Sequence, residues 1–499
     1  MKVPRLIAAL LIAATAITVA SCGKNASPDG AMQPKLQFNS EGRLRIAQFT
    51  DIHWNPRAAN CDTTEATIRA VVAASHPDFA VLTGDIVTDD PAIEGWKDII
   101  RIFEDLELPF TVEMGNHDAE HMSKDSIYSL VTASPLYVGD RGPTDIHGYG
   151  NCALPVAASD GSGRTAAVIY TIDSNDYQPR VELGHYDWIH FDQIAWYRNC
   201  AARFAEANGG KPVPSLAFFH ICLPEYAEIT DDPKTYGTRD EGAGAPADIN
   251  SGLFASMAEK GDIMGIFTGH DHDNDYIGML RGVALGFGRV SGTEAYGNLK
   301  RGARIIDLYE GQRKFDTYIV TPDGREPAWY YPSAINQAEE EAATYLPALA
   351  AQPATENGVD FVYYEGPDIK GTVDSIVYKG TEVLRGATSN FDIGGARVDD
   401  HFAFKFRSLL RVPRRGIYRF YTYSDDGSVL RVDGTKVVDN DGGHSARRRE
   451  GSIALEAGLH LVEVDYIENY MGQELEVGFT SRDIPETVIP DSLLFRPGK

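Results

Sequence analysis

Cysteine is scarce in this sequence, with 5 residues in a chain of 499, and this excludes the small disulfide-dense scaffolds of secreted proteins. Long apolar runs are absent after residue 20, which excludes a polytopic membrane protein. Positively charged residues are also few: the chain has 46 Lys and Arg against 72 Asp and Glu, which gives a net charge of −26. A surface this acidic repels phosphate backbones, so we expect no binding to a nucleic-acid backbone.

The one long apolar run covers residues 6–20 and follows Lys2 and Arg5. It is shorter than the roughly 20 residues of a spanning helix and precedes Ser21-Cys22, which predicts an export signal. The pattern resembles a bacterial lipoprotein signal, in which Cys22 would be lipidated and become the mature N-terminus. We therefore expect a lipoprotein of a bacterial cell envelope, on the periplasmic or surface side, attached to the membrane only through lipid on Cys22. A plain signal peptide or an uncleaved anchor is the alternative.

The other cysteines are Cys61, Cys152, Cys200 and Cys222. An exported compartment permits disulfides, and four cysteines allow three pairings between which the sequence does not choose. Buried thiols are the alternative, because a chain of this length can build a core without disulfides. The spacing is not that of a zinc site.

Composition and periodicity divide the chain into segments. We predict a signal over 1–21, a tether over 22–40, a domain over 41–332, a linker over 333–358 and a domain over 359–499. In the first domain, short apolar runs such as 44–49 alternate with helical patterns such as 63–75, which is typical of an α/β sandwich core flanked by helices. In the last domain, runs such as 402–406 and 418–423 alternate with period two, which predicts a separate all-β sandwich.

A series of polar clusters follows the β-rich runs of the first domain. The clusters are Asp51-Ile52-His53, Gly84-Asp85, Gly115-Asn116-His117-Asp118, His220 and Gly269-His270-Asp271-His272. Residues just past the carboxyl ends of strands in an open α/β sheet converge on one crevice, so these groups can meet. Carboxylate, amide and imidazole ligands together suit Mn, Fe or Zn. Each cluster alone is common in turns, but their order after successive strands indicates a site for two metal ions.

These clusters resemble the calcineurin-like metallophosphoesterase superfamily over residues 43–330. The sequence around these clusters is similar to the branch related to purple acid phosphatases. Examples are Phe49-Thr50-Asp51-Ile52-His53 and Gly269-His270-Asp271-His272. Purple enzymes place a metal-binding Tyr three residues after the Gly-Asp aspartate, where this chain has Thr88. The resemblance therefore implies the same metal site, but without the bond between tyrosinate and iron that colours the purple enzymes.

The resemblance implies metal ligands in two groups that share one carboxylate. They are Asp51, His53 and His272 for one ion, Asn116, His220 and His270 for the other, and Asp85 for both. His117 would face the substrate and protonate the leaving oxygen or stabilise charge on the phosphoryl group, and Asp118 would orient His117.

The implied function is hydrolysis of phosphomonoesters by attack of a metal-bound hydroxide. Phosphodiester hydrolysis by the same metal pair is the alternative. A different class of function is a non-catalytic glycan-binding protein of the cell envelope, in which the metal site is vestigial.

The last domain resembles the β-sandwich first described in anthrax protective antigen and found appended to glycosidases and adhesins. The resemblance covers residues 359–481 and rests on 416–420, on Ser424-Asp425-Asp426-Gly427 and on Val432-Asp433-Gly434. In glycan-binding members the paired aspartates, here Asp425 and Asp426, hold calcium that contacts sugar hydroxyls. An Asp-Asp-Gly pattern is also a good turn, so glycan binding and a structural or docking role both stay open.

Overall fold

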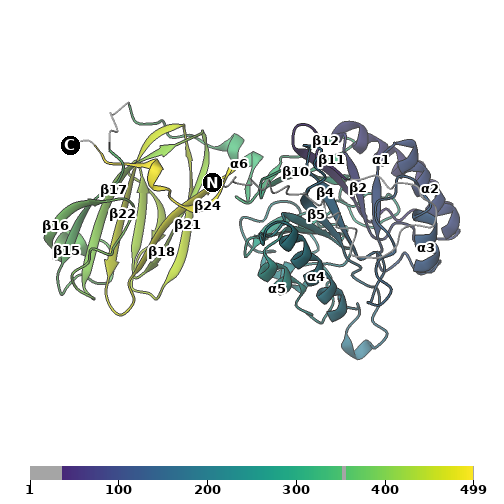
Figure 1. Cartoon of the computed structure of the whole chain (residues 1–499), viewed down its shortest axis with the longest axis horizontal. Helices are drawn as coiled ribbons and strands as arrows, with labels where there is room; N and C mark the ends of the chain where they lie inside the picture. Colours follow the sequence, from purple (N-terminus) through teal and green to yellow (C-terminus); the bar gives the residue numbers. More distant parts are fainter. Residues whose placement is uncertain (1–35, 351–355, 498–499) are drawn as a thin grey trace, which may run out of the picture. The chain divides into compact units, whose positions relative to one another are not determined.

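The computed structural model describes residues 36–350 and 356–497. The predicted signal, Cys22 and most of the tether lie outside the described residues. Within the described part, no helix has the length and apolar character needed to cross a membrane. Internal contacts divide the chain into two compact units, with the boundary in the sequence between Glu326 and Pro327, six positions before the predicted end of the first domain (Figure 1).

The first unit contains two mixed sheets with helices beside them. The first sheet has the order β11-β10-β1-β2-β3, with β12 paired to β11, and the second has the order β4-β5-β6-β7-β9-β8. The first sheet consists of β1 (Arg43–Phe49), β2 (Phe79–Thr83), β3 (Phe110–Glu113), β10 (Ala303–Tyr309), β11 (Phe315–Thr321) and β12 (Gly324–Arg325). The second sheet consists of β4 (Cys152–Ala157), β5 (Thr165–Thr171), β6 (Ser215–Phe218), β7 (Ile263–Thr268), β8 (Ile277–Leu280) and β9 (Val283–Phe287).

The two sheets pack face to face, and helices cover their outer faces. Gln48 in β1 donates a hydrogen bond to the carbonyl of Thr268 in β7 at 3.0 Å, and the rings of Phe267 and Phe315 lie 5.7 Å apart. Figure 1 shows α1, α2 and α3 on one side and α4 and α5 on the other. The helices are α1 (Cys61–Ser75), α2 (Ala92–Asp105), α3 (Lys124–Val131), α4 (Phe191–Ala207) and α5 (Leu253–Lys260), with short 3-10 turns η1 (Val181–Leu183) and η2 (Pro224–Glu228). The predicted α/β sandwich flanked by helices is confirmed.

The strands that lead to the polar clusters are parallel and covered on both faces. β1, β2 and β3 pair in parallel, as do β5, β6, β7 and β9. Every residue of β2 and β7 is buried, which explains why their sequences are continuous apolar runs rather than alternating ones. Because their carboxyl ends lie at the same edge, the residues that follow them meet there.

The second unit is an antiparallel β-sandwich preceded by a short hairpin and helix. The hairpin of β13 (Trp329–Tyr331) and β14 (Ile335–Asn336) leads into α6 (Gln337–Ala342), whose first turn is capped by the Asn336 side chain accepting the Glu339 N–H at 2.9 Å. The predicted linker over 333–358 therefore begins with ordered structure.

The sandwich consists of a large sheet with the order β16-β15-β17-β22-β19-β20, with β25 beside β17, and a smaller sheet with the order β21-β18-β23-β24. Its elements are β15 (Val359–Glu365), α7 (Ser375–Lys379), β16 (Thr381–Thr388), β17 (Phe402–Val412), β18 (Gly416–Asp425), β19 (Ser428–Val432), β20 (Thr435–Asn440), β21 (Arg447–Leu455), β22 (Gly458–Glu468), β23 (Glu474–Ser481), β24 (Ile484–Val488), η3 (Asp491–Leu493) and β25 (Leu494–Phe495). Alternate residues of β17, β18 and β22 form one aromatic and aliphatic core, as period two predicts. The predicted separate all-β domain is confirmed.

No disulfide joins the cysteines of the described residues. Cys152, Cys200 and Cys222 are buried, and Cys61 is half-buried at the start of α1. Of the two alternatives that the sequence left open, the structure favours buried thiols.

Candidate metal centre

Several predicted ligands lie just after the ends of parallel strands and have unusual backbone conformations. Asp51 and His53 follow β1, Asp85 follows β2, and His270 follows β7; their φ angles are 51°, 45°, 48° and 78°. Left-handed backbone is costly for residues other than glycine and is concentrated at functional sites. The strand ends therefore turn sharply so that these side chains enter the same space.

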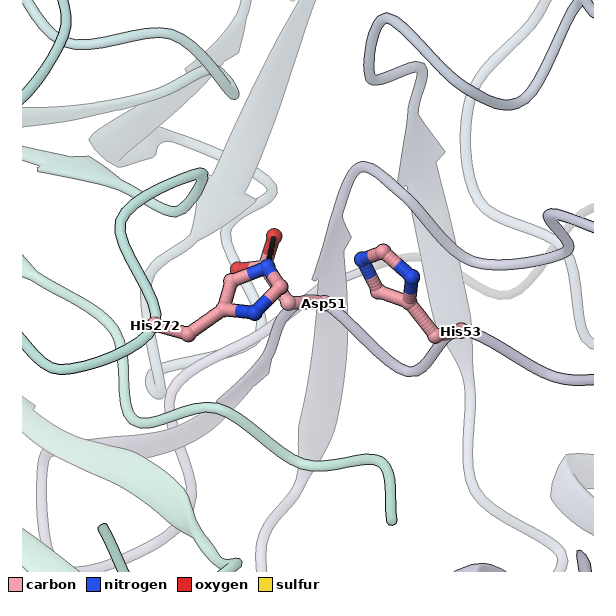
Figure 2. A group of neighbouring side chains, drawn as sticks. All are labelled: Asp51, His53 and His272. Atoms are coloured by element: carbon pink, nitrogen blue, oxygen red, sulfur yellow. Dashed lines mark ion pairs between the residues drawn. The ribbon is translucent and has the colours of Figure 1, made fainter. Parts of the chain in front are cut away.

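Asp51, His53 and His272 form the first ligand group. One ligand atom of each lies within 4.8 Å of the others, and Nε2 of His272 lies 3.3 Å from Oδ1 of Asp51. Figure 2 shows these side chains approaching one another, with Asp51 and His53 on the loop after β1 and His272 on the loop after β7. The Thr50 hydroxyl donates to Oδ2 of Asp51 at 2.7 Å, which holds the carboxylate in place.

Asp85, His220 and His270 form the second ligand group. Nε2 of His220 lies 3.2 Å from Oδ2 of Asp85 and 3.3 Å from Nδ1 of His270. The other ring nitrogen of His220 lies 2.8 Å from the Thr83 carbonyl, which must accept a hydrogen from it. This contact leaves Nε2 of His220 as the ligand atom.

Asp85 lies between the two groups. Its Oδ2 atom is 3.7 Å from Nε2 of His53 in the first group and 3.2 Å from Nε2 of His220 in the second. Ligand atoms that share an ion at about 2.0–2.2 Å lie roughly 3.0–3.5 Å from one another, so the 3.2 Å separation from His220 fits bound metal and the 3.7 Å separation from His53 is slightly longer. A Cβ atom on Gly115 would collide with the Asp85 carboxylate, which explains the glycine in the third cluster.

Asn116 offers a buried oxygen suited to a cation. Its amide nitrogen donates to the Tyr177 hydroxyl at 3.0 Å. Its Oδ1 atom is buried and has no hydrogen-bond partner within the described residues, and the same holds for Nε2 of His53. Buried polar atoms without partners are costly, and a metal ion would satisfy both.

The protonation of the imidazoles suits ligation. Burial lowers the pKa of His53 to about 4 and that of His270 to about 3, so both rings are neutral near pH 7. Burial also opposes the charge on His220, but the adjacent Asp85 carboxylate outweighs it and raises the pKa to about 10. A metal ion would replace that proton, because ligating histidine is neutral.

The structure corrects the role expected of Asp118. Its Oδ1 atom accepts the backbone N–H groups of Ile86 and Val87 at 2.8 and 3.0 Å, and Oδ2 accepts that of Gly115 at 2.7 Å. Its carboxylate is thus used to hold the loops after β2 and β3. The carboxylate that contacts the His117 ring belongs to Glu120, whose Oε1 atom lies 2.9 Å from Nδ1.

Aromatic side chains that sequence reasoning missed border the centre. The Tyr186 ring packs edge-on against His270 with centroids 4.7 Å apart, and the Tyr296 ring stacks on His272 at 3.9 Å. Tyr177, which contacts Asn116, lies beside Tyr186 in an isolated bridge of the segment between β5 and α4. No motif marks these tyrosines, because they reach the centre from long connections.

A smaller acidic group lies in the second unit. One oxygen each of Asp425, Asp426 and Glu468 lie within 4.8 Å of one another. The structure therefore brings together the two predicted residues and adds Glu468 from the end of β22. Burial is the main reason that the pKa of Glu468 rises to about 7, and the charges of Asp426 and Asp425 add to it.

Two packed sheets with histidine and carboxylate groups at the ends of parallel strands define the metallophosphoesterase class of fold. The family model of calcineurin-like phosphoesterases matches residues 44–274, and that of the PA14 domain matches residues 355–493. The chain is 31% identical to "Probable inactive purple acid phosphatase 29" of Arabidopsis thaliana, over 56% of this chain and 80% of the relative. The chain belongs to the calcineurin-like phosphoesterases, in the branch related to purple acid phosphatases, and carries a C-terminal PA14 domain.

The chain is also similar to a second plant protein and to one solved structure. "Probable inactive purple acid phosphatase 14" of Arabidopsis thaliana is 27% identical over 60% of this chain and 83% of its own length. A solved dimetal phosphatase from Danio rerio is 12% identical, with 57% of this chain and 98% of that chain covered and a TM-score of 0.41. The family that the sequence motifs indicated is confirmed by the family model and by the relative that is 31% identical.

Proposed function

We propose that the chain is an exported binuclear phosphoesterase that hydrolyses phosphomonoesters. The observation that carries the proposal is the pair of ligand groups joined by Asp85, together with the unsatisfied oxygen of Asn116. A site with carboxylate, amide and imidazole donors suits Mn, Fe or Zn. When bound, two such ions would activate water near neutral pH and neutralise the phosphoryl charge.

The chain's own residues would complete the reaction. His117 is about one-third exposed and lies beside the first ligand group, its ring centroid 5.8 Å from that of His53. From there it would donate a proton to the ester oxygen as the bond from phosphorus to that oxygen breaks. Tyr186 and Tyr296 would border the bound ester and keep the metal-binding histidines in place.

The names of the plant relatives include the word "inactive", which applies to those proteins. For this chain, activity is supported by the placement of every predicted histidine and aspartate ligand in the two groups. A vestigial site would be free to lose ligands, because nothing would keep uncompensated carboxylates and imidazoles buried together.

The test is turnover of 4-nitrophenyl phosphate and of bis(4-nitrophenyl) phosphate by the full chain loaded with Mn²⁺, Fe²⁺ or Zn²⁺. We expect about two ions per chain by elemental analysis, and hydrolysis that chelation abolishes and metal restores. Preference for the diester would replace the monoesterase with the phosphodiesterase. Metal binding without turnover of either ester would favour the non-catalytic alternative.

A second proposed function is sugar binding by the PA14 domain through calcium at Asp425 and Asp426. Both Asp426 oxygens accept backbone N–H groups, from His444 at 2.7 Å and Asn469 at 2.8 Å, which preorganises the carboxylate. The adjoining Tyr470 and Met471 side chains are 61% and 99% exposed, so they are open to a ligand. Asp425→Asn should abolish calcium-dependent binding to a glycan array, whereas Asp439→Asn, an exposed partner of Lys436, should not.

We also propose export and lipidation at Cys22, from the N-terminal pattern alone. Cys22→Ala should release the protein from the membrane fraction without loss of phosphoesterase activity, because a lipid supplies attachment and no chemistry. Continued membrane association of the variant would favour an uncleaved anchor.

A further inference from the structure

Glu120 is folded back onto His117 by a tight turn. The Glu120 backbone N–H donates to the His117 carbonyl at 3.1 Å, and this turn brings Oε1 of Glu120 to 2.9 Å from Nδ1 of His117. The two side chains are 37% and 40% exposed, so the pair lies at the mouth of the centre rather than in the core.

Tyr177 joins this pair to the metal centre. Its hydroxyl lies 3.0 Å from the Asn116 amide nitrogen, 3.4 Å from Nδ1 of His117 and 3.3 Å from Oε1 of Glu120. Since the amide nitrogen can only donate, the hydroxyl accepts from Asn116 and directs its own hydrogen to Glu120. One hydroxyl thus fixes a metal ligand and the carboxylate beside His117 together.

The contact with Glu120 decides which nitrogen of His117 can serve the substrate. An ionised carboxylate only accepts hydrogen bonds, so Nδ1 must carry the hydrogen. The other nitrogen, Nε2, is then the atom that faces a bound ester. Nε2 takes up a proton to give the imidazolium, whose charge the Glu120 carboxylate offsets, and passes that proton to the ester oxygen as the bond to phosphorus breaks. Without a partner at Nδ1, a neutral imidazole can take either tautomer and the ring can rotate.

We propose that Glu120 is the positioning residue that holds His117 in the tautomer and orientation needed for proton transfer, an inference that rests on the proposed phosphoesterase function. Asp118, which follows His117 in sequence, does not fill this role because it is bound to three backbone N–H groups. Because the His117 and Glu120 side chains are more than one-third exposed, their contact contributes little to stability, and replacing Glu120 should leave the fold intact.

The test compares Glu120→Gln and Glu120→Ala with Asp192→Asn in the full chain. Asp192 forms a matched pair with His147, Oδ2 to Nδ1 at 2.7 Å, and neither residue belongs to the centre. The substrates are 4-nitrophenyl phosphate, a good leaving group, and glycerol 2-phosphate, a poor one. Metal content is measured on each variant.

We expect both Glu120 variants to lose about 10- to 100-fold in kcat on glycerol 2-phosphate and less than about threefold on 4-nitrophenyl phosphate, with unchanged metal content. Asp192→Asn should match the unmodified chain. Equal losses on both substrates, lost metal, or unchanged kcat on glycerol 2-phosphate would each overturn the proposal.

A second readout needs no turnover. In the Zn²⁺-loaded chain labelled with ¹⁵N-histidine, the His117 signals, assigned by their absence in His117→Asn, should report hydrogen on Nδ1. In Glu120→Ala they should shift to the other tautomer or to a mixture. An unchanged Nδ1–H signal would refute the inference. If the unmodified chain hydrolyses neither ester, the proposed function fails, and this spectrum still decides whether Glu120 sets the tautomer.

Discussion

Oδ1 of Asp85 accepts the backbone N–H of His117 at 2.9 Å, while Oδ2 of the same carboxylate faces both groups of metal ligands. One side chain therefore fixes the distance between the expected metal ions and the residue expected to transfer a proton. Because the contact to His117 runs through the backbone, the His117 ring stays available to substrate.

Replacing Asp85 should empty both ligand groups. Asp85→Ala removes the carboxylate between them, so we expect the content of both ions to fall and phosphoesterase activity to be lost. Elemental analysis of the purified chain measures this directly. Asp89→Asn is the matched control, because Asp89 is exposed and bonds to Asn55 at 3.0 Å. Retention of two ions by Asp85→Ala would contradict the bridging role.

Replacing His117 should separate chemistry from metal binding. We expect His117→Ala to lower kcat by roughly 10²–10⁴-fold, the usual contribution of a general acid, with both ions retained. The loss should be smaller for esters with good leaving groups, which need little protonation. A loss that is the same for good and poor leaving groups would show that His117 acts on phosphoryl charge instead.

Removing the Tyr177 hydroxyl should weaken one ligand group. Tyr177→Phe deletes the acceptor that orients the Asn116 amide, so we expect the metal affinity of the Asp85, His220 and His270 group to fall by about 10- to 100-fold. Competition with a chromogenic chelator measures the affinity. Tyr186→Phe is the control, since Tyr186 packs on His270 through its ring, which phenylalanine keeps. Equal affinities in both variants would argue that Tyr177 has no such role.

A buried carboxyl away from the ligands should make stability depend on pH. Burial, with the charge of Asp173 adding to it, raises the pKa of Glu113 well above its usual range. The folded chain then keeps a proton that the unfolded chain releases above about pH 4.5, so stability falls as pH rises, by at most about 1.4 kcal/mol per unit.

Glu113→Gln removes this titration. Its free energy of unfolding relative to the unmodified chain should therefore increase between pH 5 and pH 8 in denaturant titrations. A difference that stays constant with pH would show that Glu113 has an ordinary pKa in the folded protein.

Much of the fold and most of the ligand set could be predicted from sequence, because both depend on patterns of apolar and polar residues that are close together in the sequence. Strands buried on both faces are continuous apolar runs, so β2 and β7 are recognisable, and polar residues after such strands must meet at one edge. Asp51, Asp85 and His220 were found in this way. The period-two runs of the second unit predicted its sandwich for the same reason.

Only the tertiary structure decided which neighbours tune the ligands. The sequence placed Asp118 beside His117, but its carboxylate turns inward to three backbone N–H groups, and Glu120 makes the contact instead. Tyr177 and Tyr296 come from long connections whose sequence has no periodicity, so nothing local indicates where they end. Strand ends follow from local patterns of burial, whereas side-chain partners depend on distances between segments that are remote in sequence, and these distances exist only once the sheets have packed.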